Sequence, residues 1–404
     1  MIIKPFTKEF ALLEDAMANL VPLENSIPVA PLKLAALKGC EEMAKSIDQY
    51  LVQFRKDLVS HHKDRRNLSG YSEESFLLDC DCPRFGTGEA KGRLMESVRG
   101  VDLFLLVDVC NWSITYQSFG HTNHMSPDDH FQDLKRIIAA ANGKAHRINV
   151  IMPFMYEGRQ HKRNSRESLD CALALRELTS MGVKNIITFD AHDPRVMNSI
   201  PLAGFDNFMP TYQFLKALIK SVPDLHLDND HLMIISPDEG AMPRAVYFAN
   251  ILGVDMGMFY KRRDYSTIIN GKNPIVAHEF LGDSLDGKDV VIIDDMISSG
   301  ESMLDVAKQV KDRGAARVFV CTTFGLFTDG LEKFDDCYAK GYFEKIITTD
   351  LTYRSPNLIG RPWYEPAAMG KYIASIIDIL NHDVSVEKVR DTTTKITNLL
   401  DKCK

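Results

Sequence analysis

The sequence contains no apolar run of about 18 residues, the length that a membrane-crossing helix needs. Its first residues, MIIKPFTKEFALLEDA, lack the basic end and apolar core of a secretion signal. It also lacks a long basic run, and its formal net charge is −7. These absences predict a cytoplasmic protein that neither crosses a membrane nor serves as a platform for nucleic acid.

The cysteine pattern does not predict a disulfide framework. Eight cysteines are scattered along the chain, and only Cys80 and Cys82 lie close together. A C-x-C pair without distant partners is a weak metal signal. We therefore expect reduced thiols, as in cytosolic proteins.

The 404 residues are enough for two domains and an additional segment. Residues 1–75 predict a helical amino-terminal extension, because apolar residues return every three or four positions. The residues that carry this spacing are Leu32, Leu34, Leu37, Met43, Ile47, Leu51, Phe54 and Leu58.

From about residue 80, apolar strand runs alternate with amphipathic helical runs, which predicts α/β domains with mostly parallel sheets. We expect two such domains, at 76–212 and 213–365, followed by carboxy-terminal helices at 366–404. The predicted strands are Asp102–Val109, Ile148–Phe154, Asn185–Asp190, Leu232–Ser236, Val290–Asp294, Arg317–Thr322 and Lys345–Thr349. The predicted helices are Phe131–Asn142, Ser165–Met181, Tyr212–Val222, Gly240–Leu252 and Ser302–Arg313. In such sheets, ligands bind beyond the carboxyl ends of the strands.

The most informative stretch is DVVIIDDMISSGES at 289–302. A buried strand ends at Asp294 and Asp295, a loop of small residues follows at 298–302, and a helix begins. Backbone N–H groups of such a loop and of a helix amino terminus bind phosphate. The two carboxylates can accept hydrogen bonds from ribose hydroxyls or face a divalent cation. This stretch predicts a sugar-phosphate site.

Polar or basic residues follow the other strands as well. A basic loop at 159–163 suits phosphates, although a solvated loop fits it equally well. Asp190 and His192 end the next strand, and either a metal site or a capping turn fits them. Asp238 follows another strand, where a helix cap is the alternative. Basic residues at 261–263 begin a long polar segment that can close over a substrate.

Taken in order, these segments resemble the ribose-phosphate diphosphokinase family, also called phosphoribosyl-diphosphate synthetases. The segments that carry the resemblance are RFGTGEAKGRLMESVRGVDLFLL (84–106), PFMYEGRQHKR (153–163), ITFDAH (187–192), SPDEGAMPRA (236–245), KRR (261–263), DDMISSGES (294–302) and AAMGKYIASII (367–377). They span about three quarters of the chain.

The resemblance implies two tandem type I phosphoribosyltransferase-like domains and a Mg²⁺-dependent reaction between ATP and ribose 5-phosphate. It assigns catalysis to Lys261 and Arg263, and it places His192, Asp238 and Asp190 at the metal. It assigns ATP binding to Arg159, Gln160, His192, Thr87, Gly88 and Glu89, of which Gly88 and Glu89 line the adenine site of a neighbouring subunit. It assigns ribose 5-phosphate to Asp294, Asp295, Ser298, Ser299, Gly300, Glu301 and Ser302. It also implies a homo-oligomer, either a dimer or a hexamer.

The chain departs from the family pattern near these sites. Ser298, Thr87 and His161 each stand where the family has an aspartate, and Glu301 replaces a small residue. Residues 111–124 are an insertion for which we expect a polar surface loop, although its histidines are also able to bind metal. An active diphosphokinase is the leading interpretation. The alternatives are a non-catalytic regulatory relative and a phosphoribosyltransferase that consumes the same sugar diphosphate.

Overall fold

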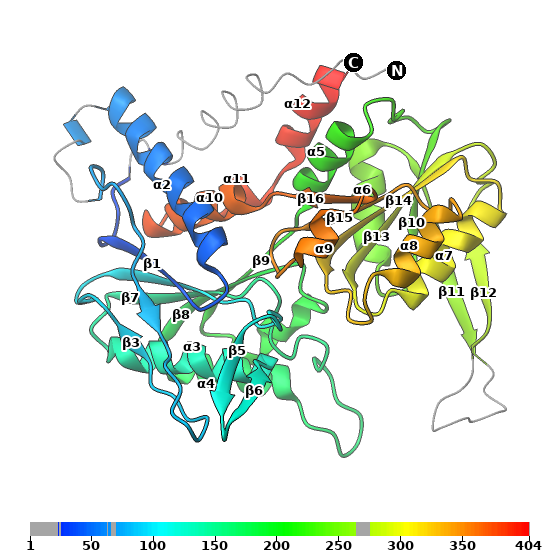
Figure 1. Cartoon of the computed structure of the whole chain (residues 1–404). Coiled ribbons are helices and arrows are strands. Elements are labelled where there is room, and N and C mark those ends of the chain that lie inside the picture. Colours follow the sequence, from blue (N-terminus) through cyan, green and yellow to red (C-terminus); the bar gives the residue numbers. More distant parts are fainter. Residues whose placement is uncertain (1–22, 24–25, 63, 66–69, 264–274, 404) are drawn as a thin grey trace.

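The computed structural model describes residues 23, 26–62, 64–65, 70–263 and 275–403. These residues form two α/β domains side by side, each built on its own sheet (Figure 1). None of the described helices is both long and apolar enough to span a bilayer. The predicted α/β class with mostly parallel sheets is confirmed.

The first domain contains a fully parallel sheet with the strand order β1-β4-β7-β8-β9. Its strands are β1 (Leu32–Ala36), β4 (Asp102–Leu106), β7 (Arg147–Ile151), β8 (Val183–Phe189) and β9 (Gly204–Phe208). Its larger helices are α2 (Glu41–His61), α3 (Pro127–Ala141) and α4 (Asp170–Ser180). Ser126 and Asp129 form a capping box that starts α3, as the chemistry of these residues favours.

The second domain contains a sheet with the order β12-β11-β10-β13-β14-β15-β16, in which only β12 is antiparallel to its neighbour. Its strands are β10 (Leu232–Ser236), β11 (Asp255–Arg263), β12 (Ile275–Leu281), β13 (Asp289–Ile297), β14 (Arg317–Gly325), β15 (Lys345–Thr349) and β16 (Tyr364–Ala367). Its helices are α5 (Thr211–Ser221), α6 (Met242–Leu252), α7 (Glu301–Asp312), α8 (Glu332–Ala339) and the short α9 (Pro356–Ile359). We propose a domain boundary between β9 and α5, close to the expected one.

The prediction of a helical extension over 1–75 is wrong for Leu32–Ala36, which forms β1 and pairs in parallel with β4. Five apolar or partly apolar residues fit a strand and a helix equally well, and pairing with a neighbouring strand decides between them. The helical spacing that follows is real, because Glu41–His61 forms α2.

Two further expectations about loops need correction. The insertion at 111–124 was expected to be a polar surface loop; its strands are exposed or half-buried as expected, but they form a β-hairpin of β5 (Thr115–Ser118) and β6 (His121–His124). Lys261 and Arg263 lie within the long strand β11 rather than in a loop, and that strand pairs with β12. The rest of the predicted closing segment, residues 264–274, lies outside the described residues.

The carboxy-terminal helices join the two domains. α10 (Gly370–Asn381) packs against α2 and shares a core with β1 and β4, so it belongs to the first domain although it follows β16. α11 (Glu387–Arg390) comes next, and α12 (Thr393–Cys403) then packs against α5 of the second domain. The chain thus crosses back to the first domain after completing the second.

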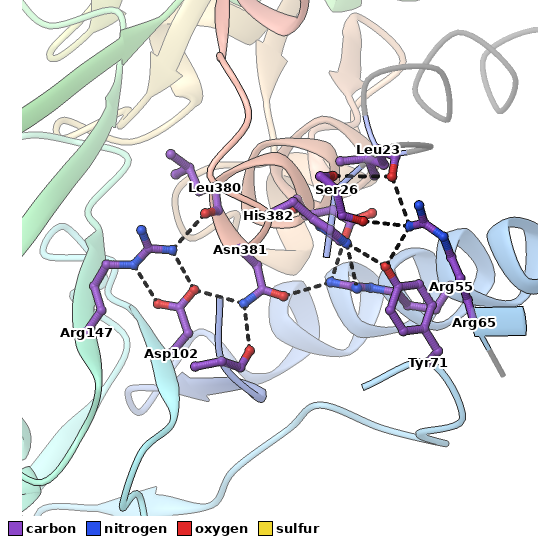
Figure 2. Close-up of polar contacts among 12 residues, drawn as sticks. Leu23, Ser26, Arg55, Arg65, Tyr71, Asp102, Arg147, Leu380, Asn381 and His382 are labelled. Atoms are coloured by element: carbon purple, nitrogen blue, oxygen red, sulfur yellow. Dashed lines mark hydrogen bonds and ion pairs between the residues drawn. The ribbon is translucent and has the colours of Figure 1, made fainter. Parts of the chain in front are cut away.

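A buried polar network fixes the end of α10 to the first domain (Figure 2). Asp102 is fully buried and accepts two hydrogen bonds from Arg147, at 2.9 and 2.7 Å. Asn381 donates to the same carboxylate at 2.9 Å and accepts from Arg55 at 2.8 Å. Burial lowers the pKa of His382 to about 4, so the ring is neutral and accepts from Arg55 and Tyr71. Each of these buried groups therefore fixes the position of its neighbour, and together they hold the end of α10 against the first domain.

We predict that Arg147→Met destabilises the protein by about 3 kcal/mol or more, because it leaves the buried Asp102 carboxylate without its counter-charge. Urea unfolding followed by circular dichroism measures this shift. The control is Lys308→Met on α7, which removes an exposed pair with Asp312. The unfolding midpoint of the control should stay nearly unchanged, because water already screens that pair. Equal unfolding midpoints for the two variants would contradict the role of this network.

Candidate active site

The carboxyl ends of β8 and β13 bring residues of the two domains into direct contact. His192 follows β8, and Asp295 lies near the end of β13. The Nδ1 atom of His192 lies 2.6 Å from Oδ2 of Asp295, a hydrogen bond between residues 103 positions apart. Asp295 is buried, whereas His192 is partly exposed. The structure thus joins a predicted metal residue to a predicted ribose residue.

Arg244 of α6 makes a second connection at the same place. Its Nε donates to Oδ1 of Asp190 at 2.5 Å, and its Nη2 lies 3.8 Å from Asp295. Thr323 donates to the other carboxylate oxygen of Asp190 at 2.5 Å. Asp190 is buried and has a positive φ of 42°, a conformation that is uncommon outside glycine. Both of its oxygens therefore hold the second domain, and its expected place as a metal ligand has no geometric support here.

The two adjacent carboxylates of β13 have opposite electrostatic environments. Burial would raise the pKa of Asp295, but the hydrogen bond from His192 and the charge of Arg244 outweigh it and hold the pKa below its usual value. Burial raises the pKa of Asp294 well above its usual value, and the charges of Asp295 and Asp238 raise it further. The negatively charged form of Asp294 is therefore unfavourable in this site unless a cation or a hydrogen-bond donor binds beside it.

Asp238 lies in the loop between β10 and α6. Its Oδ1 accepts from the backbone N–H groups of Gly240 and Ala241, at 3.0 and 3.2 Å. These bonds make a tight turn ahead of α6. They do not cap the helix as the alternative interpretation expected, because its N-cap residue is Ala241, which makes no side-chain capping bond. Its negative charge also acts on Asp294, which sets Asp238 beside the end of β13. The two roles are compatible, because one carboxylate oxygen makes the turn.

The loop at 298–302 leads from β13 into α7. Gly300 has a positive φ of 84°, and a Cβ there would lie 2.1 Å from the ring of Phe334. Only glycine therefore fits at this position. Glu301 is exposed and forms a 2.7 Å ion pair with Lys333 of α8, so its charge is directed to the surface and neutralised. Ser298, Ser299 and Ser302 complete this segment.

The basic loop at 159–163 lies beside His192. Arg159 and His192 line one small pocket together with Phe154, Asp190, Met296 and Phe324. The ring centroids of His161 and His192 are 5.3 Å apart, and Nε2 of His161 is 3.5 Å from Asp193. Gln160 donates to the backbone oxygens of Lys162 and Ser168, at 3.3 and 2.7 Å. Gln160 therefore shapes the loop, while Arg159 contributes to the pocket.

The turn that contains Thr87, Gly88 and Glu89 lies elsewhere on the first domain. Thr87 donates to Glu89 at 2.8 Å, and the backbone of Gly88 is left-handed. The backbone of Gly86 accepts from Phe119 at the tip of the β5–β6 hairpin. None of these residues lines the pocket around Arg159 and His192. The structure therefore does not bring this turn to the same site within one chain.

Lys261 and Arg263 are described by their backbone alone. Lys261 pairs with His278 of β12, and the register shifts between Arg262 and Arg263. β11 neighbours β10 in the sheet, so its end lies on the same edge as the residues that follow β10 and β13.

Sequence reasoning missed Arg244 and Thr323. Arg244 lies within SPDEGAMPRA, in the first turn of α6, and no function was assigned to it. An arginine in the first turn of a helix is unfavourable for the helix dipole, which signals a separate reason for its presence. Thr323 lies in an apolar strand and gives no comparable signal.

Comparisons with known proteins show the family of this chain. A family model described as the N-terminal domain of ribose phosphate pyrophosphokinase matches residues 32–182, and a phosphoribosyl transferase domain model matches 207–353. The first of these begins with β1.

The chain is also similar in sequence to several ribose-phosphate pyrophosphokinases. The ribose-phosphate pyrophosphokinase of Corynebacterium glutamicum is 32% identical over 270 residues, which cover 66% of this chain and 74% of the relative. That of Chlorobaculum tepidum is 27% identical over 323 residues, or 79% of this chain and 83% of the relative.

A crystal structure shares the fold. Phosphoribosylpyrophosphate synthetase from Mycobacterium smegmatis superimposes with a TM-score of 0.67 at 20% identity, over 87% of this chain and 99% of the other. The chain belongs to the ribose-phosphate pyrophosphokinase family.

Proposed function

We propose that this protein transfers the diphosphoryl group of ATP to the C1 hydroxyl of ribose 5-phosphate, giving 5-phosphoribosyl 1-diphosphate and AMP. Family membership supports this reaction class. The observation that carries the proposal is the contact between His192 of the first domain and Asp295 of the second. It closes the two halves around one site, as a reaction between two substrates requires.

In this proposal the second domain binds the sugar phosphate. The 298–302 loop and the start of α7 supply backbone N–H groups for the 5-phosphate. Asp294 accepts hydrogen bonds from ribose hydroxyls, which relieves the repulsion that raises its pKa. The outward direction of Glu301 supports this assignment, since its charge is paired with Lys333.

The first domain binds ATP in this proposal. Arg159 contacts the phosphates from the pocket beside His192, and the neighbouring basic residues of the 159–163 loop add positive charge. Asp295 acts as a positioning residue: it fixes the orientation of His192 through Nδ1 and leaves Nε2 to face the nucleotide. Arg244 lies beside Asp295 and forms an ion pair with Asp190 of the first domain, so it fixes the position of Asp295 relative to that domain.

The residues present fit Mg²⁺. That ion binds through one or two carboxylates together with phosphate oxygens and water, and Asp238 and Asp294 repel one another at the strand ends. Asp238 and His192 are the groups we assign near the metal. Bound there, Mg²⁺ would neutralise phosphate charge and orient the triphosphate.

We assign Lys261 and Arg263 to stabilisation of the diphosphoryl group while it is transferred. The barrier to attack by a sugar hydroxyl on phosphorus is mainly charge and alignment, so cationic side chains stabilise the transition state. Their position on β11, which lies beside β10 at the same sheet edge, supports this assignment.

The proposed setting is a reducing compartment such as the cytoplasm, and the assembly is a homo-oligomer. Free thiols at the seven described cysteines support the first part. The separation of Gly88 and Glu89 from the pocket of their own chain supports the second, because these residues are then available to a neighbouring subunit.

We expect the purified protein to form AMP from ATP, Mg²⁺ and ribose 5-phosphate, measured by chromatography. Lys261→Ala should remove most turnover yet keep ribose 5-phosphate binding, because the lysine acts on the transition state. Lys308→Ala on α7 is the control and should be fully active. Equal AMP formation by Lys261→Ala and the control would exclude Lys261 from the chemistry.

We expect substitutions of the adjacent residues Asp294 and Asp295 to have different effects on ribose 5-phosphate binding and on turnover. Asp294→Ala should weaken ribose 5-phosphate binding about tenfold or more, equivalent to about 1.4 kcal/mol, as measured by calorimetry. Asp295→Asn should keep that affinity and lower kcat, because it loosens His192. Asp312→Ala on α7 serves as the exposed-carboxylate control. A large loss of sugar-phosphate affinity in Asp295→Asn would instead make Asp295 a ribose ligand.

A shared adenine site predicts complementation between subunits. Glu89→Ala and Lys261→Ala should each be nearly inactive alone, because one lacks the adenine contact and the other the catalytic group. Co-assembled subunits should regain activity at sites that combine an intact Glu89 with an intact Lys261. No recovery in mixed oligomers, verified by light scattering and differently tagged subunits, would place both residues in one chain's site.

A further inference from the structure

A second cluster of metal-ligating side chains lies on the second domain, away from the site described above. Among the described residues, His226, Asp228 and His231 form the one group of three whose possible ligand atoms all lie within 4.8 Å of one another. They belong to the segment between α5 and β10. We propose that this segment binds one transition-metal ion, such as Zn²⁺, through two imidazoles and one carboxylate.

The segment is held in place independently of any ion. Asp228 Oδ1 accepts from the backbone N–H groups of Asp230 and His231, at 3.1 and 3.2 Å. Asn229 accepts from the N–H of Asp255 on β11 and, through its backbone oxygen, from Lys288, at 2.7 and 2.8 Å. The starts of β11 and β13 therefore anchor the loop, and the ligands are pre-organised.

The side-chain geometry needs only a small adjustment. The imidazole rings of His226 and His231 stack with centroids 4.7 Å apart, and His231 Nδ1 lies 2.6 Å from Asp228 Oδ1. Two ligand atoms each about 2.1 Å from one zinc ion lie on the order of 3.4 Å apart in a tetrahedron. Metal binding would therefore lengthen the distance between His231 Nδ1 and Asp228 Oδ1 and shorten the larger distances between the other ligand atoms. Rotation of the side chains is enough for both changes.

The ligand set selects the class of metal. Imidazole nitrogen suits zinc, copper and nickel, whereas magnesium prefers oxygen ligands and would not be held by two imidazoles and one carboxylate alone. Asp224 and Asp230 lie in the same short segment and add negative charge that attracts a cation, although Asp224 also pairs with Arg317. Three protein ligands leave a coordination position for water, so the affinity should be moderate rather than that of a closed structural site.

The location separates this ion from the reaction. The cluster precedes β10, whereas Asp238 follows it. A strand rises about 3.3 Å per residue, so the two ends of β10 are on the order of 15 Å apart. The proposed ion therefore does not take part in the chemistry. It cross-links the loop and raises the thermal stability of the second domain by binding the folded state alone.

The test is calorimetric titration of the full chain with ZnCl₂ in excess Mg²⁺, which occupies oxygen-rich sites. We expect one ion per chain and a higher unfolding temperature with Zn²⁺. The variants His226→Ala and His231→Ala should each lower the affinity by more than the roughly tenfold that loss of an outer-shell partner causes. Both should lose the temperature shift and keep the AMP-forming activity of the unchanged protein.

His121→Ala, in the β5–β6 hairpin, is the matched control because it removes another exposed histidine. It should bind Zn²⁺ as the unchanged protein does. Visible absorption of bound Co²⁺ gives a second measurement that reports imidazole ligation directly. Absence of Zn²⁺ binding, or equal binding in a folded His226→Ala/His231→Ala double variant, would overturn the proposal.

Discussion

The arrangement of the site depends on hydrogen-bonded charges that pass from one domain to the other. His192 and Asp190 leave the first sheet, while Asp295 and Arg244 belong to the second domain. The charges of Asp190, Arg244 and Asp295 are largely removed from water, and each would be unfavourable without its partner. This mutual requirement makes the relative position of the two sheets part of the site. If the domains separate, Asp190 loses the counter-charge of Arg244, and Asp295 loses its hydrogen bond with His192.

The carboxy-terminal helices give this arrangement its mechanical support. α10 returns to the first domain and is fixed there by Asp102 and Arg55 through Asn381, while α12 packs on the second domain. The two domains are therefore joined at the site and again at the end of the chain. Two separated attachments restrict rotation of one sheet relative to the other far more than one attachment does. Such restriction serves a site whose halves must remain aligned.

The sequence predicted individual elements better than the contacts between them. Parallel strands buried on both faces leave apolar runs, so β10 and β15 were predicted with the observed bounds. β1 was missed because only its pairing with β4 distinguishes it from the helix that follows, and β9 because GFDNF has polar positions inside the strand. The rule that ligands bind beyond strand ends pointed to the candidate carboxylates, but which of them touch depends on the packing of two domains. Asp295 accordingly looked equivalent to Asp294, although strand alternation sends neighbouring side chains in opposite directions. Arg244 had no predicted role because its partner Asp190 lies 54 positions away.

Two of the four departures from the family pattern, Glu301 and His161, have a neighbour of complementary charge. Glu301 adds a negative charge at the start of α7, and Lys333 of α8 pairs with it at the surface. His161 stands where the resemblance implies an aspartate, and a carboxylate is still nearby because Asp193 lies 3.5 Å away. The charge of Glu301 is therefore compensated at the surface and does not oppose a phosphate in the 298–302 loop. His161 lies beside a carboxylate and next to His192. Both substitutions are thus compatible with a divergent active enzyme.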